Sequence, residues 1–147
     1  MKANYSSKKH GRKAAMLDKI LVDTSVWIEF FRRKESSISL RLREYLKLNQ
    51  TYYTGPIAVE LYQGAKTSKE VEVIRQLLQT IHYVEITRSH YHHAGQISHQ
   101  AARSGKIFSV VDLILAVVAY DEQLKLFSLD THFKEISQFC PLTLETP

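Results

Sequence analysis

The sequence lacks the features of a disulfide-stabilised or membrane protein. It has a single cysteine, Cys140, which cannot form an internal disulfide, and this is typical of proteins from a reducing compartment. Its longest apolar stretch, residues 107–120, contains Asp112 and is too short to span a bilayer. The basic residues near the start lead into Asp18 and Lys19 and not into an apolar segment, so no signal peptide is expected. We therefore expect a soluble, cytoplasmic protein.

Internal repeats and domain linkers are also missing, and 147 residues are enough for one domain without a structural metal. Acids are missing from residues 1–15, whose five basic residues equal the whole formal net charge of +5. These residues show no apolar periodicity and predict a disordered basic tail before a domain over residues 16–147. The tail is either an inert leader, with Met16 as the functional start, or a basic arm that contacts a nucleic acid. Because basic tails are common, we favour the first interpretation.

Strands are expected to alternate with helices along this domain. Apolar runs predict strands over residues 20–22, 52–54, 83–86 and 126–129, with residues 142–144 as a candidate edge strand. Caps and periodicity predict helices over residues 26–33, from Ser36 or Ser37 onwards, from Gly55 onwards, and over residues 69–81, 89–102, 110–124 and 133–139. The sequence thus predicts an α/β fold of three layers, with a mainly parallel central sheet of four or five strands flanked by helices. The side chains expected to face the core include Trp27, Phe30, Phe31, Leu40, Leu42, Tyr45, Leu46, Leu48, Val73, Ile74, Leu77, Leu78 and Ile81.

Four acids are expected at one edge of this sheet. Asp23 ends the first strand, Glu60 lies in the first turns of the helix after the second strand, and Asp130 ends the fourth strand. Parallel strands end at the same edge, where the following helices begin. Only about two residues separate the helix of Asp112 from the fourth strand, so its first turn must lie at this edge as well.

Each acid has a structural alternative. Asp23 and Asp130 could cap helices, with Thr24 or Ser25 as other candidates for the first cap. Asp112 could be the acid of a capping box that begins at Ser109, and Glu60 could be a surface residue. Four such roles converging on one edge are a less economical account than one catalytic site.

Four neighbouring carboxylates repel one another unless a cation offsets their charge. Oxygen ligands without His or Cys suit Mg²⁺ or Mn²⁺ better than zinc. The predicted catalytic residues are therefore Asp23, Glu60, Asp112 and Asp130, in a site for a divalent metal ion.

The order of the four acids and their neighbours resembles the PIN-domain nucleases, most closely the VapC-type toxins of toxin–antitoxin pairs. The segments that carry this resemblance are Val-Asp-Thr-Ser at 22–25, Ala-Val-Glu-Leu at 58–61, Val-Val-Asp-Leu at 110–113 and Ser-Leu-Asp-Thr at 128–131. The resemblance spans residues 19–144. It implies a metal-dependent endoribonuclease, the toxin of a type II pair, that hydrolyses RNA with a metal-activated water. It also implies a homodimer and a cognate antitoxin whose C-terminal segment lies in the active-site groove.

The resemblance also implies roles for single residues. Asp23 and Asp112 match the main metal ligands, while Glu60 and Asp130 would complete the shell through water or hold a second ion. Ser25 and Ser128 match positions where a small hydroxyl residue supports these acids. The family more often has a further Asp where this chain has His132, which weakens the expectation of a second ion. A contact of His132 with the scissile phosphate is the less favoured alternative to a surface position.

Three other functions were considered. A housekeeping RNA-processing PIN nuclease would share the site, and a neighbouring antitoxin gene would distinguish the two. A PIN-like module that binds RNA or protein without cutting would be favoured by the loss of an acid, and none of the four is lost. A phosphotransfer enzyme of the haloacid-dehalogenase type needs a second Asp two residues after the first, where Ser25 stands.

Basic and histidine clusters give weaker signals. Two groups are candidates for phosphate contacts or else solvated charges, namely Arg32, Arg33 and Lys34, and Arg103 with Lys106. On a helix, His92 and His99 share a face, whereas His90 and His93 point away from that pair. No Cys or acid is near them in the sequence, so a zinc site is not expected. Cys140 is interpreted as a small core residue.

Overall fold

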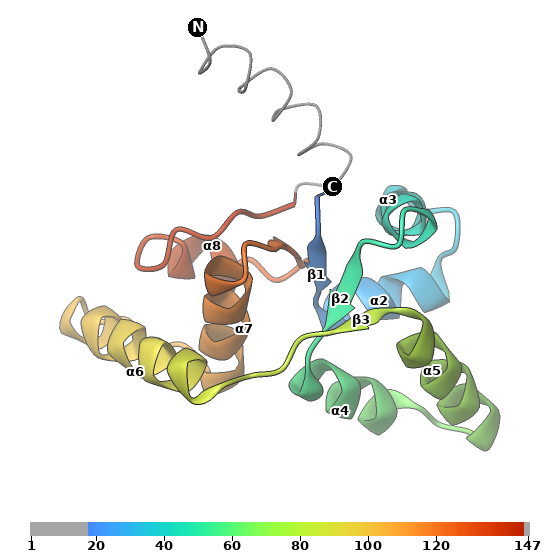
Figure 1. Ribbon diagram of the computed structural model, residues 1–147, viewed down its shortest axis with the longest axis horizontal. Coiled ribbons are helices and arrows are strands. Elements are labelled where there is room, and N and C mark those ends of the chain that lie inside the picture. Colours follow the sequence, from blue (N-terminus) through green and yellow to red (C-terminus); the bar gives the residue numbers. More distant parts are fainter. Residues whose placement is uncertain (1–17, 146–147) are drawn as a thin grey trace, which may run out of the picture.

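A four-stranded parallel sheet forms the centre of the molecule in the computed structural model, which describes residues 18–145 (Figure 1). The strands are β1 (Ile20–Val22), β2 (Thr51–Tyr53), β3 (His82–Tyr83) and β4 (Lys125–Phe127), in the order β3-β2-β1-β4. Leu144 adds an isolated parallel bridge to Leu126 on the free side of β4. The predicted parallel α/β fold is confirmed.

Seven helices flank the sheet in the described residues. In Figure 1, four lie to the right of β1: α2 (Thr24–Arg32), α3 (Ser37–Lys47), α4 (Gly55–Gly64) and α5 (Ser68–Thr80). The other three lie to its left: α6 (Arg88–Arg103), α7 (Val110–Asp121) and α8 (His132–Ile136). No helix among residues 18–145 combines the length and apolar character that crossing a membrane requires.

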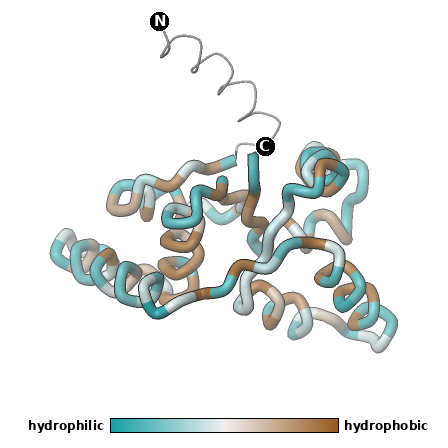
Figure 2. The backbone as a smooth tube through the Cα atoms, in the orientation of Figure 1, coloured by the Kyte–Doolittle hydropathy of each residue, from teal (hydrophilic) through white to brown (hydrophobic). Residues whose placement is uncertain are grey.

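The core is organised around β1 and α7. All three residues of β1 are fully buried, as an apolar strand between two others and two helical layers must be. Seven consecutive residues of α7, from Leu113 to Ala119, are buried, because this helix is apolar on every side and packs between the sheet and α6. Figure 2 shows the contrast between the hydrophobic α7 and the largely hydrophilic α6.

The helices α6 and α7 form an antiparallel hairpin that places Asp112. The first turn of α6 meets the last turn of α7, where Nε2 of His90 lies 2.9 Å from Oε2 of Glu122. At the other end, residues 104–109 connect the helices through Gly105, whose φ of 77° favours glycine. Because α7 runs from there back to the start of β4, its first turn lies at the edge where the strands end. This connection explains how α6 leads into α7, which the sequence did not reveal.

Several predicted boundaries were wrong. Helix α2 begins at Thr24, directly after Asp23, and not near Val26. Strand β3 covers residues 82–83 and not 83–86, because its partner β2 ends at Tyr53, just before α4 begins. Helix α7 ends at Asp121, since Gln123 adopts a left-handed conformation with φ 58°, and β4 then starts and ends earlier than predicted. Helix α8 ends at Ile136 and not at Phe139.

Four side chains predicted to face the core are exposed: Phe31, Leu40, Leu48 and Val73. In α3 the buried residues Ile38, Leu42 and Tyr45 follow helical spacing, and Leu40 lies two residues from Ile38 and Leu42, on the opposite face. In α5 the buried pair is Ile74 and Leu78, one position past Val73. The predicted tail over residues 1–15 and the alternative start at Met16 lie outside the described residues.

Candidate active site

Asp23 is held by two serine hydroxyls. It is buried at the end of β1, and its Oδ2 accepts hydrogen bonds from Ser25 Oγ at 2.9 Å and Ser128 Oγ at 2.7 Å. The backbone N–H of Leu129 donates to Ser25 Oγ, and that of Asp130 donates to Ser128 Oγ, each at 3.0 Å. These bonds join the turn after β1 to the loop after β4. In the described part of the chain, Oδ1 of Asp23 accepts no hydrogen bond and remains available as a ligand atom.

Asp23 does not act as a helix cap. It occupies the N-cap position of α2, but within residues 18–145 its side chain makes no capping bond to the helix backbone. The oxygen that a cap would use is engaged by Ser25 and Ser128 instead. The structural alternative for this residue is therefore wrong.

Asp130 contacts both the backbone and the side chain of His132. Its Oδ1 accepts from the backbone N–H of His132 at 2.9 Å. The N-cap residue of α8 is nevertheless Thr131 and not Asp130. The same oxygen lies 3.0 Å from Nδ1 of His132, whose side chain is largely exposed. His132 begins α8 and is thereby fixed beside the acids.

Asp112 is the acid that the site perturbs most clearly. It lies in the first turn of α7, where its backbone N–H donates to Ser109 Oγ at 3.1 Å. Burial raises the pKa of its carboxyl group above the ordinary value, a hydrogen bond with Ser109 opposes this, and the charges of Asp130 and Asp23 raise it further. Asp130 and Asp23 are thus close enough for their charges to act on Asp112.

Glu60 reaches this edge from the neighbouring helix α4. Its Oε1 accepts from Thr24 Oγ1 at 2.7 Å, and Thr24 directly follows Asp23. Glu60 itself is exposed, on the margin of α4. Among the described residues, the structure therefore groups the ligand atoms of Asp112 and Asp130 with His132. Asp23 lies outside this group, although its charge reaches Asp112, and Glu60 is linked to the edge through Thr24.

The donor set suits a divalent cation. Asp112, Asp130 and His132 each offer one ligand atom, and these atoms lie within 4.8 Å of one another. Two of the three donors are carboxylates, the donors that Mg²⁺ and Mn²⁺ prefer. A cation would offset both the burial of the Asp112 carboxylate, which is the main reason for its raised pKa, and the smaller effect of the neighbouring negative charges. The residues therefore fit a metal ion.

The basic residues predicted to contact phosphates differ in their surroundings. Arg32 and Lys34 line a cavity of about 570 Å³ between α2, α4 and α5, which Glu60 also lines. Arg33 follows α2 as its C-cap and is exposed. Lys106 lies 3.8 Å from Glu135 of α8, and Arg103 has no hydrogen-bond or ion-pair partner in the described part of the chain.

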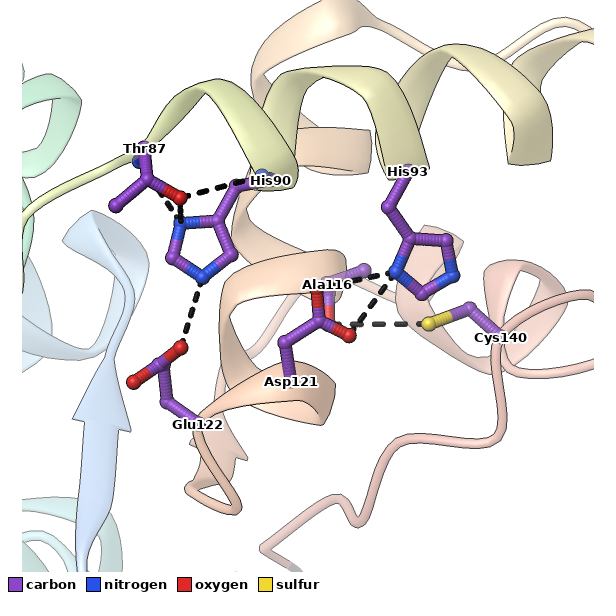
Figure 3. Close-up of polar contacts among 7 residues, drawn as sticks. All are labelled: Thr87, His90, His93, Ala116, Asp121, Glu122 and Cys140. Atoms are coloured by element: carbon purple, nitrogen blue, oxygen red, sulfur yellow. Dashed lines mark hydrogen bonds and ion pairs between the residues drawn. The ribbon is translucent and has the colours of Figure 1, made fainter.

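The histidines of α6 divide as predicted, but the expected lack of nearby acids was wrong. His90 pairs with Glu122, and Nδ1 of His93 lies 3.0 Å from Asp121 Oδ1 (Figure 3). His92 and His99 are exposed. These acids come from the end of α7, so local sequence could not show them. The group of possible metal ligands found in residues 18–145 contains none of the four histidines. Cys140 is buried, as predicted.

Sequence reasoning missed Thr24 as the partner of Glu60 and gave too little weight to His132. The signal for His132 was its position two residues after Asp130 at the start of a helix, where the Asp side chain can accept the backbone N–H. For Thr24 there was no comparable signal, because its contact spans 36 residues.

Comparisons with known proteins identify relatives over most of the chain. The sequence pattern of the PIN domain matches residues 20–138. VapC ribonuclease Mb1587 from Mycobacterium bovis is 25% identical over 127 residues, which cover 84% of this chain and 95% of that protein. Ribonuclease VapC11 from Mycobacterium tuberculosis matches to the same extent.

Solved structures share the fold. DNA-bound VapBC from Salmonella typhimurium superposes with a TM-score of 0.73 at 20% identity, covering 87% of this chain and 97% of that chain. VapC20 from Mycobacterium tuberculosis, described as a sarcin-ricin loop cleaving toxin, has a TM-score of 0.62 at 14% identity and covers 88% of this chain and all of that chain. At these identities the likeness establishes the fold alone.

Proposed function

The chain belongs to the PIN-domain family, and from this premise we propose that it is a metal-dependent endoribonuclease, the toxin of a type II toxin–antitoxin pair. Its curated relatives are named ribonucleases, and a solved structure with a similar fold is a toxin–antitoxin complex from Klebsiella pneumoniae. We also propose that it acts in the cytoplasm.

The observation that carries the proposal is the group of ligand atoms from Asp112, Asp130 and His132 at the sheet edge where β1 ends in Asp23. Burial, and to a smaller extent the charges of Asp130 and Asp23, raise the pKa of Asp112, and the protein nevertheless holds Asp23 in place with two serine hydroxyls. Such an arrangement lowers the stability of the folded chain, so a role in binding a cation explains it better than a structural role.

We assign Asp23 and Asp112 as direct ligands of Mg²⁺ or Mn²⁺. Asp130, Glu60 and His132 would complete the coordination shell, directly or through water. When bound, such an ion supplies a deprotonated water and offsets the charge that develops on the phosphodiester. Ser25 and Ser128 orient Asp23 by fixing its Oδ2 and leaving Oδ1 for ligation. Thr24 orients Glu60 in the same way.

Cleavage of total cellular RNA by the purified protein tests this proposal. We expect discrete fragments with Mg²⁺ or Mn²⁺ that disappear with EDTA and in Asp23→Asn. Glu60→Gln should also lose activity, while the matched change Glu44→Gln, on the exposed surface of α3, should not. No cleavage by antitoxin-free protein with either metal would favour the non-cutting module. Cleavage that survives in Asp23→Asn would show that the site is misplaced.

We propose that the cognate antitoxin occupies the cavity beside Glu60. Half-exposed Ile28 and Phe31 line it together with Arg32 and Lys34, so it fits a segment with apolar side chains and an acid. Phe31→Ala should weaken inhibition by the co-expressed antitoxin, whereas Leu48→Ala, on exposed α3 surface, should leave inhibition unchanged.

A small open reading frame upstream would supply the antitoxin, and its absence would favour a housekeeping RNA-processing nuclease. We also propose a homodimer, as the family resemblance implies. Sedimentation velocity of the purified chain tests this assembly state.

A further inference from the structure

The outer face of α6 carries a row of basic and histidine side chains. Arg88, His92, His99 and Arg103 follow one another at intervals of four, seven and four residues, so they lie along one side of the helix. All four are exposed. The buried residues of α6, His90, Ala94, Ile97 and Ala101, lie on its other side, against α7. We call the four exposed residues the α6 row.

The α6 row is not used within the described chain. None of its four side chains has a hydrogen-bond or ion-pair partner among residues 18–145. By contrast, His90 and His93 turn towards α7 and pair with Glu122 and Asp121 (Figure 3). The sequence has no Asp or Glu from residue 86 to residue 111, so no acid of this stretch offsets the row. The row therefore combines the two positive guanidinium groups of Arg88 and Arg103 with two imidazoles that offer N–H donors.

Gly95 lies in the middle of the row, between His92 and His99. Glycine destabilises a helix interior relative to alanine, so a reason to have it there is expected. Packing within this chain gives none, because a Cβ at Gly95 would meet no atom within 4 Å. The missing side chain leaves an open place where another molecule can approach the helix backbone closely.

The row leads towards the acidic site. It is about 24 Å long for a helix of 16 residues. Its last member, Arg103, ends α6, and the following loop carries Lys106 and then Ser109, which caps the helix of Asp112. A strand of RNA lying along the row would therefore reach the acids at its end.

We propose that the α6 row binds the phosphodiester backbone of single-stranded RNA and guides it to the acidic edge. This rests on the proposed function for the identity of the reaction, but not for the binding itself. The guanidinium groups of Arg88 and Arg103 match the charge of phosphates, and the two histidines can donate ring N–H groups to phosphate oxygens. A symmetric contact between two copies of the row would bring like charges together, so the observations favour RNA over a second copy.

RNA affinity in EDTA tests the proposal separately from cleavage. The probe is a fluorescein-labelled single-stranded RNA of roughly 16 nucleotides, and its anisotropy is followed from low to high salt. Arg88→Gln/Arg103→Gln should weaken binding at low salt and reduce the slope of log K against log salt by about 1.4, for two lost contacts of about 0.7 each. The control Lys47→Gln/Arg75→Gln removes the same charge from α3 and α5 and should match the wild type in RNA affinity.

A second variant separates a loss of RNA binding from a loss of folding. Gly95→Glu introduces a better helix former and places a negative charge within the row. It should keep or raise the melting temperature and yet lower RNA affinity. Circular dichroism and thermal melts of every variant provide the reference for folding.

The outcomes distinguish this inference from the proposed function. Row variants that bind RNA like the control would overturn the inference while leaving the nuclease intact, and so would a wild type that does not bind the probe. Row-dependent binding without any cleavage in Mg²⁺ or Mn²⁺ would support the row and contradict the proposed function. Row variants that change the sedimentation coefficient and not RNA affinity would show a contact between copies, which also overturns the inference.

Discussion

Oδ2 of Asp23 lies 2.7 Å from the hydroxyl of Ser128, a residue 105 positions further along the chain. The same hydroxyl accepts the backbone N–H of Asp130, so one serine fixes both an acid at the end of β1 and the loop that carries another. Parallel pairing of β1 and β4 makes this possible, because it ends both strands at the same edge.

Removal of the Ser128 hydroxyl should therefore lower activity without unfolding the protein. Ser128→Ala leaves the carboxylate of Asp23 with one hydrogen bond in place of two, and the loss of such a supporting contact typically costs 10–100-fold in metal affinity or activity. The measurement is kcat/KM for RNA cleavage over a range of Mn²⁺ concentrations. Ser128→Thr should retain most of the activity, and Ser137→Ala, whose hydroxyl donates to the Lys134 carbonyl in α8, serves as the matched control. Equal activity of Ser128→Ala and wild type would contradict the orienting role.

Asp112→Asn should abolish cleavage and at the same time stabilise the metal-free protein. The pKa of Asp112 is raised in the folded state, mainly by burial, so the folded state holds this proton more tightly than the unfolded state. As the pH rises from below about 3.8 through the raised pKa, the wild type loses stability that the amide variant keeps. Thermal melts in EDTA should show a higher melting temperature for Asp112→Asn at pH 7 and little difference below pH 4. A lower melting temperature at pH 7 would show that Asp112 is a structural acid.

Cys140 should be unreactive in the folded protein at pH 8. Burial, and to a smaller extent the charge of Asp121, raise the pKa of its thiol to about 11. Because this pKa lies above the ordinary value of 9.0, the neutral thiol stabilises the folded state below pH 9, and the contribution is lost as the pH rises towards 11. Labelling with iodoacetamide at pH 8 should be slow in buffer and fast in urea. Rapid labelling of the native protein would mean that the end of the chain opens readily.

The sequence could predict those parts of the fold that local patterns determine. The bounds of β1 were predicted correctly, because a short, continuous apolar run that ends at Asp23 indicates a buried strand. Capping residues such as Ser36 also gave helix starts correctly, since a cap is a local contact. By contrast, the end of β3 depends on where β2 stops, and the phase of the buried face in α3 depends on the sheet that it covers, so both predictions were partly wrong.

The acidic edge followed from the same rules, because parallel strands and short connections bring their ends together. The residues that contact acids across the fold could not be predicted from these rules. Thr24 meets Glu60 across 36 residues, and His90 and His93 meet acids about 30 residues away, at the end of an antiparallel helix. Such contacts depend on how two helices lie against each other, and no short motif encodes that arrangement.

His132 stands where the family resemblance leads one to expect a further Asp, and its replacement tests the ligand set. Burial raises the pKa of Asp112 and the positive form of His132 partly opposes this, while Nδ1 of His132 lies 3.0 Å from Asp130 Oδ1. His132→Asp would add a carboxylate beside those of Asp112 and Asp130, so the metal-free protein should become less stable while the Mg²⁺ concentration for half-maximal cleavage should fall. His132→Ala removes a donor without adding charge and should raise the Mn²⁺ concentration needed by about 10-fold.

Lys134→Ala, a neighbouring change on exposed α8, should leave both metal requirements unchanged. Metal titrations of cleavage and melts in EDTA measure the two effects separately. If His132→Ala and His132→Asp shift neither the metal requirement nor the melting temperature, His132 takes no part in the site. The ion would then be bound by the carboxylates of Asp112, Asp130 and Asp23, without His132.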